Sequence, residues 1–262
     1  MTLSPILRVL STLKKHKVRS LLIGGQACII YGGAEFSRDS DFVVLAEPDN
    51  LLALQKALRA LKAAPVYFPE LTLEYLRKGH GCHFRCAARG VEGLRVDILG
   101  KLKGCAPFGA LWARRNTVRL PGLGGIPVIS LADLVESKKT QRDKDWLMLA
   151  RLVEADIYTA GGSARGGRLL WWLAQARVPA TLVELCAAHP AAARKAARSR
   201  PLLRAALSGD MRRLAVLLKR EEAAERRKDA AYWTPLKKEL EALRLGRARA
   251  RCAARYTQAG RQ

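Results

Sequence analysis

The sequence predicts an α/β (α+β) domain, with a mixed sheet and flanking helices, followed by an all-helical C-terminal domain. Short apolar runs alternate with amphipathic stretches as far as about residue 158. The segment "TAGGSARGG" then interrupts this alternation, and only helical patterning follows it. We therefore predict an α/β domain over residues 1–158, a glycine-rich linker over 159–167 and a basic helical domain over 168–262.

The elements of the first domain follow from local signals. Ser4 and Pro5 are typical of an N-cap and a first helical position, so a helix is expected to about Lys15. Apolar runs bounded by turn residues predict strands within 19–25, 41–46, 82–88, 93–100, 116–120 and 126–130. The runs 82–88 and 93–100 are expected to be neighbouring strands. Helices are expected over 26–33, over 49–63 with Asp49 or Asn50 as the cap, and over 131–157 with Ser130 as the cap.

The second domain reads as helices throughout. Amphipathic spacing predicts them over 167–177, 181–189, 201–207, 211–229 and 234–252. Core packing is the expected role of the tryptophans on these helices, Trp171, Trp172 and Trp233. The basic tail, residues 244–262, reads either as a solvated helix end or as an RNA-contacting segment.

The charge of the chain is unusual. Lysine and arginine exceed aspartate and glutamate by 24, with a pI near 10.5. Residues 1–160 hold 24 basic against 15 acidic residues, and residues 161–262 hold 23 against 8. Such a field favours polyanionic partners, nucleic acid first and an anionic membrane second. The alternative explanation is a codon bias that enriches arginine and alanine.

The cysteines and the N-terminus indicate a cytoplasmic protein. Six cysteines lie at irregular spacings without a CxxC pair, and the N-terminus lacks the order of a signal peptide. No window holds 18 consecutive apolar residues, so no membrane partner is expected. Reduced thiols are the expectation for this compartment.

Two acidic residues stand one position apart at the start of an apolar strand. Asp39 and Asp41, as i and i+2, would point to one side of that strand. Carboxylate oxygens that face solvent are suitable ligands for Mg²⁺ or Mn²⁺. Such a cation would also offset the repulsion between the two carboxylates. Asp97 lies within a second apolar strand, "RVDIL", where a charged residue needs a partner. If the two strands adjoin, Asp97 becomes the third carboxylate of a metal cluster.

A glycine pair precedes these acids. Gly24 and Gly25 come between a strand and a short helix, where small residues let a phosphate approach the backbone. The surrounding sequence has neither the GxGxxG fingerprint nor a Walker lysine.

Together these motifs resemble the nucleotidyltransferase superfamily typified by DNA polymerase beta. The resemblance rests on Ile23-Gly24-Gly25, Asp39-Ser40-Asp41 and Val96-Asp97-Ile98, and it covers roughly residues 18 to 156. The flanking "YGGAEFSRDSDFVV" and "ISLADLVESKKTQRDKD" are similar to the minimal and abortive-infection-toxin branches. Members of the superfamily transfer a nucleoside monophosphate from an NTP such as ATP to a hydroxyl, with two metal ions.

The resemblance implies a role for each matching residue. Gly24 and Gly25 would hold the triphosphate; Asp39 and Asp41 would bind the metals, and Asp97 would share one ion. Lys138, or its neighbour Lys139, would reach the phosphates, and Arg38 would bind phosphate as well. On the expected long helix Lys138, Arg142 and Asp145 fall on one face, where Asp145 would orient Lys138 or Arg142. Gln26 departs from the serine often found after the glycine pair.

The acceptor stays open. The positive charge disfavours a cationic small molecule and suits RNA such as tRNA. A protein hydroxyl, a non-catalytic nucleic-acid-binding protein with the same fold, and a toxin neutralised by an antitoxin are the alternatives.

Structural roles compete with each proposed site residue. Asp39 and Asp41 read alternatively as solvated acids, the glycine pair as a turn, and Arg38 as a partner of Glu35 or Asp39. Asp97 would then form a buried salt bridge to an arginine such as Arg85, and Lys138 and Lys139 would include a surface lysine. Zinc binding by the segment "HGCHFRC" lacks a complete ligand set, and His83 or Arg85 would otherwise face the active site.

Overall fold

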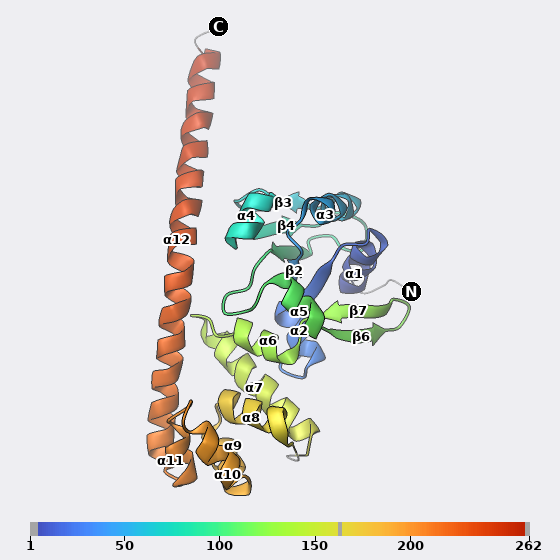
Figure 1. The fold of residues 1–262 in the computed structure, drawn as a ribbon. Coiled ribbons are helices and arrows are strands. Elements are labelled where there is room, and N and C mark those ends of the chain that lie inside the picture. The colour runs from blue at the N-terminus through green and yellow to red at the C-terminus, as the bar shows by residue number, and fades with distance from the viewer. Residues whose placement is uncertain (1–4, 162–163, 260–262) are drawn as a thin grey trace. The chain divides into compact units, whose positions relative to one another are not determined.

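A computed structural model describes residues 5–161 and 164–259 of the 262-residue chain, with side chains described as far as residue 246. It shows a mixed α/β domain with a seven-stranded sheet, followed by an all-helical C-terminal region (Figure 1). The coarse fold class predicted from the sequence is therefore confirmed. Among the described residues, no helix combines the length and apolar character that a membrane crossing requires. Ser4 and residues 162–163 of the expected linker lie outside the described residues.

The sheet has the order β3-β4-β5-β2-β1-β7-β6. β2 runs parallel to β5 and β1 parallel to β7, and the other neighbours are antiparallel. All six predicted strands are present, and β4 and β5 are neighbours as expected. The bounds are β1 Ser20–Ile23, β2 Asp39–Val44, β3 Ala64–Pro65, β4 Gly81–Arg85, β5 Arg95–Leu99, β6 Asn116–Leu120 and β7 Gly124–Val128.

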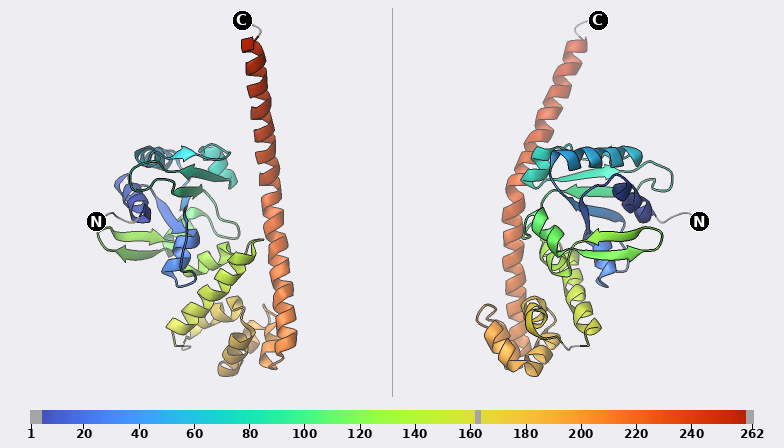
Figure 2. Two further views of the ribbon diagram at one scale, coloured as in Figure 1. Left: turned by 180° about the vertical axis from the view of Figure 1, so that it is seen from behind. Right: turned by 45° about the vertical axis from the view of Figure 1, so that its right-hand side comes forward.

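The two faces of the central strands differ in chemistry. Leu22, Phe42 and Ile98 are register neighbours on one face and are buried. Helices α1 (Pro5–Lys15) and α3 (Pro48–Ala60) cover this face, as the right-hand view of Figure 2 shows. Because side chains alternate along a strand, the acidic residues of β2 and β5 project from the other face. The same face also carries the buried Leu21 and Val43, so the acids lie beside apolar core residues.

The start of α3 differs from the prediction. Glu47 is the N-cap and Pro48 takes the first helical position, whereas Asp49 or Asn50 was expected to cap the helix. Asn50 is buried, and its side chain accepts from the backbone N–H of Arg19 at 2.7 Å and donates to the carbonyl of Leu45 at 2.8 Å. It joins α3 to the ends of β1 and β2 and does not cap its own helix.

The remaining helices extend to the C-terminal region. Two long helices were predicted incorrectly: the expected helix 131–157 is broken at residues 138–142, and the expected pair 211–229 and 234–252 is one helix that contains Pro235. The bounds are α2 Gly24–Ile30, α4 Leu73–Lys78, α5 Phe108–Arg114, α6 Leu131–Ser137, α7 Asp143–Thr159, α8 Gly166–Gln175, α9 Pro179–Ala188, α10 Pro190–Ala196, α11 Leu203–Leu207 and α12 Met211–Ala259.

The chain forms two compact units, which we describe separately. The sheet unit comprises Met1–Gln26, Arg38–Ser130 and Ala231–Gln262. The helical unit comprises Ala27–Ser37 and Leu131–Ala230. In the helical unit Trp172 is fully buried, as expected, and its indole N–H donates to Asp156 at 2.7 Å.

Candidate active site

The three predicted carboxylates come from two adjacent strands of the sheet unit. In the register of β2 and β5, Asp41 is the direct partner of Asp97, and Asp39 is the partner of Arg95. Register partners on adjacent strands project to the same face, and residues two apart on one strand do so as well. Asp39, Asp41 and Asp97 therefore occupy one face of the sheet, although Asp97 lies 58 positions from Asp39 in the sequence.

Gly24 lies directly against one of these acids. It follows β1 as the first residue of α2, and Ile23 before it is the register partner of Asp41. Its φ of +65° is in the left-handed region. A Cβ at this position would overlap the Asp41 carboxylate. Glycine is thus required both by the backbone and by the close approach of Asp41, and Gly25 continues the same turn into α2.

Asp97 is held by two basic side chains. Arg95 Nε donates to its Oδ1 at 2.8 Å, and His83 Nδ1 lies 2.9 Å from the same oxygen. Burial alone would raise the pKa of the Asp97 carboxyl, but the contacts with His83 and Arg95 outweigh burial and lower this pKa. Asp97 is therefore a carboxylate at neutral pH.

Carboxylates sharing one face are suitable ligands for a hard divalent cation. As the side chains stand, however, no three His, Cys, Asp or Glu residues in the described ranges are grouped closely enough to hold a metal ion. Asp97 Oδ1 contacts both Arg95 and His83. The three carboxylates and their alignment across β2 and β5 suit a cation. In this structure, however, Asp97 contacts the basic side chains of Arg95 and His83.

The structure also addresses the alternatives for the residues around Asp97. The buried salt bridge expected for Asp97 is formed with Arg95, and not with Arg85. The sequence contains the signal for this pair, because residues i and i+2 of a strand share a face. His83 faces the carboxylates, one of the two options left open for it. His80, in the segment considered for zinc, lies 2.9 Å from Glu239.

A cavity of about 660 Å³ is lined by Leu58 and Arg59 of α3 and by Phe84 of β4, whose side chain projects from the face opposite the acids. Tyr67 lines it together with Phe68 and Phe84. The Tyr67 ring also contacts His83 edge to face, with 5.9 Å between the ring centroids, and the Arg95 guanidinium lies 5.9 Å from its centre. An exposed aromatic ring therefore connects the cavity with the side chains that hold Asp97. Arg38 is exposed immediately before β2.

The predicted phosphate-binding lysines belong to the helical unit. Lys138 follows the end of α6 and is buried, with Nζ 3.2 Å from Asp145 Oδ1. Arg142 Nε and the Thr140 hydroxyl donate to the other oxygen of Asp145, at 2.7 and 2.6 Å. Asp145 was expected to orient Lys138 or Arg142 and contacts both, although a turn between two helices brings them together and not one helical face. Lys139 pairs with Glu136 at 2.6 Å.

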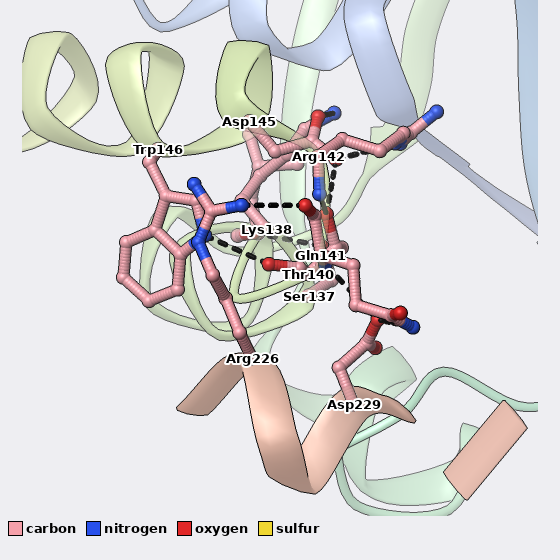
Figure 3. Close-up of polar contacts among 10 residues, drawn as sticks. Ser137, Lys138, Thr140, Gln141, Arg142, Asp145, Trp146, Arg226 and Asp229 are labelled. Carbon is pink, nitrogen blue, oxygen red and sulfur yellow. Dashed lines mark hydrogen bonds and ion pairs between the residues drawn. The ribbon is translucent and has the colours of Figure 1, made fainter. Parts of the chain in front are cut away.

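Further hydrogen bonds fix this turn. The backbone and side-chain N–H groups of Gln141 donate to the buried carboxylate of Asp229, at 3.1 and 3.2 Å. Arg226 donates to the Gln141 carbonyl at 2.6 Å, and the Trp146 indole N–H donates to the Thr140 carbonyl at 2.7 Å (Figure 3). A phosphate-binding role for Lys138 or Lys139 therefore requires exchange of its present acidic partner.

The contacts of Asp145 predict a pH dependence of unfolding. Burial raises the pKa of this carboxyl, but Lys138, Thr140 and Arg142 outweigh burial and lower it. A lowered folded-state pKa gives stability that is fully present above the unfolded pKa, about 3.9, and is lost as pH falls towards the folded value. The difference in urea midpoint between the parent protein and Asp145→Asn should shrink from pH 7 to pH 3. A difference that does not change with pH would contradict this assignment.

The chain matches no protein-family model, and comparison with curated proteins finds no significant match. The function is therefore inferred from the residues themselves. The strongest of them are the acids on one face of β2 and β5 and the glycine that follows β1.

Proposed function

We propose that the chain transfers a nucleoside monophosphate from an NTP to a hydroxyl acceptor, on a sheet of the nucleotidyltransferase type. One observation carries the proposal: the register pairs Asp41 with Asp97 directly beside Gly24. Gly24 and Gly25, at the start of α2, would accept the triphosphate through a cation held by the Asp41 carboxylate that lies against Gly24. Asp39, Asp41 and Asp97 would hold Mg²⁺ or Mn²⁺.

When bound, two such ions stabilise charge on the attacking and leaving oxygens of phosphoryl transfer. The residues of the chain supply the remaining requirements. Arg95 and His83 keep Asp97 ionised, so that it offers a negative charge to an incoming cation. Tyr67, whose ring contacts His83 and Arg95, offers an aromatic surface for a ring of the substrate.

RNA is the proposed acceptor. The excess of 24 positive charges supports a polyanion and disfavours a cationic small molecule. A second candidate, a nucleic-acid-binding protein without catalysis, is favoured by the ion pairs that hold Asp97 away from a metal cluster.

The test is label transfer. The protein is incubated with each α-labelled NTP, Mg²⁺ or Mn²⁺, and total RNA, and labelled RNA is measured. We expect transfer with one or more NTPs and a loss of at least about a thousandfold in Asp39→Ala and in Asp41→Ala, because the displacement is driven by charge stabilisation. Asp49→Ala, an exposed acid at the start of α3, is the matched control and should keep full activity. RNA binding without transfer would favour the second candidate.

A further inference from the structure

The first half of α12, residues 211–230, separates its charges between two sides. Its glutamates are partly buried and paired: Glu221 contacts Arg200 at 2.8 Å, and Glu222 contacts Arg226 at 2.7 Å. Asp229 is buried and accepts from Gln141. The negative charges of this segment are therefore largely neutralised within the helical unit.

Apart from Arg226, which is partly buried and pairs with Glu222 and Asp143, the positive charges of the same segment are exposed. They come as three doublets, Arg212-Arg213, Lys219-Arg220 and Arg227-Lys228, and these six residues form what we call the α12 basic face. The doublets recur after 7 and 8 residues, which is about two helical turns or 11–12 Å, so they line one side of the helix. Lys228 pairs with Glu225, whereas the other five side chains make no ion pair with any residue in the described ranges.

A row of unpaired cations at regular spacing matches the regular charge of a phosphodiester backbone. An anionic membrane fits less well. A helix that lies in a membrane surface inserts an apolar face opposite its cations. In α12 that apolar face, with Leu214 and Leu218, is already buried in the helical unit. Residues 211–230 also contain no Asn or Gln for reading adenine.

We propose that the α12 basic face binds the phosphate backbone of RNA without sequence specificity. The choice of RNA over DNA rests on the proposed function, because RNA offers a free 2′-hydroxyl on every nucleotide as acceptor. Binding itself does not depend on catalysis. The face would capture the polymer, and the acidic residues of the sheet unit would not take part.

The experiment measures binding of a fluorescein-labelled, mixed-sequence single-stranded RNA by anisotropy between about 50 and 200 mM salt. The test variant is Arg213→Gln/Arg220→Gln/Arg227→Gln. The control is Lys15→Gln/Arg89→Gln/Arg119→Gln, which removes the same charge from exposed residues of the sheet unit. Each phosphate contact contributes about −0.7 to the slope of log affinity against log salt. We expect the test variant to lower the magnitude of this slope by about 2 and the control to change it little.

Equal losses in the two variants, or an unchanged slope in the test variant, would overturn the proposal. Because only phosphates are contacted, DNA of the same sequence should bind with similar affinity, and label transfer to DNA but not to RNA would overturn the choice of RNA. Binding to phosphatidylserine vesicles but not to RNA would show that the partner is a membrane. Circular dichroism of the three single variants shows whether a loss of RNA binding comes from misfolding. Asp39→Ala/Asp41→Ala should bind RNA like the parent. Failure of catalysis and failure of this surface are thereby measured separately.

Discussion

Replacing Asp145 with alanine is expected to destabilise the helical unit by about 3–5 kcal/mol, because it leaves the buried Lys138 ammonium without its partner. Thr140 and Arg142 also lose the carboxylate oxygen to which they donate. The turn between α6 and α7 then has no central acceptor. The measurement is urea unfolding at pH 7, followed by far-ultraviolet circular dichroism.

Asp143→Ala is the matched control for this prediction. Asp143 begins the same helix and pairs with Arg226 at 2.6 Å, but its side chain is 93% exposed. An exposed ion pair contributes at most about 1 kcal/mol, so the control should lose no more than this. The double variant Asp145→Ala/Lys138→Met removes both charges and should recover part of the stability. Equal losses in the two single variants would show that Asp145 is not the anchor of this turn.

The strands were predictable because their signal is local and strong. Each strand is a short apolar run bounded by glycine, proline or charged residues. For β1, β2, β5 and β7 this local pattern is sufficient to predict a buried strand. The break between α6 and α7 was not predicted, although two acidic residues in one turn, Asp143 and Asp145, are typical of the first turn of a helix. The apolar spacing continues across the break and hides it. Helical spacing alone does not show where one helix ends and the next begins.

The division of α12 into two predicted helices was wrong. A proline in a helix interior removes one hydrogen bond and costs about 3 kcal/mol, so a helix that continues through Pro235 needs other support. The contacts of Glu239 with Lys78 and His80 lie beyond it in the sequence and within the sheet unit. Such long-range contacts override local preference and leave no pattern in the sequence.

The candidate site was predictable in its residues and not in its contacts. Period-two spacing placed Asp39 and Asp41 on one side, and the structure aligns Asp97 with Asp41 across β2 and β5. The pair of Asp97 with Arg95 has an i, i+2 signal within β5, but the contact with His83 depends on which strand lies beyond β5, a matter of topology. The contact of Gly24 with Asp41 likewise requires the pairing of β1 with β2.

This contact makes Gly24→Ala the second large prediction. Alanine at a positive φ costs about 1–2 kcal/mol, and the added Cβ must also displace Asp41. We expect a total loss of stability of about 2–4 kcal/mol, since overpacking typically adds 1–3. Label transfer should fall to the level of Asp41→Ala, because the displaced carboxylate no longer faces Asp97.

The variant Gly122→Ala serves as a control that separates the backbone strain of a positive φ from the displacement of Asp41. Gly122 has a φ of +75°, and a Cβ there meets no atom within 4 Å, so this variant carries the backbone cost alone. The difference in unfolding free energy between the two variants therefore measures the contact with Asp41. In Gly24→Ala/Asp41→Ala the losses should be less than additive, because removing the carboxylate relieves the overlap. If Gly24→Ala were as stable as Gly122→Ala and kept full transfer activity, Asp41 would not depend on the glycine, and the proposed phosphate seat beside it would lose its basis.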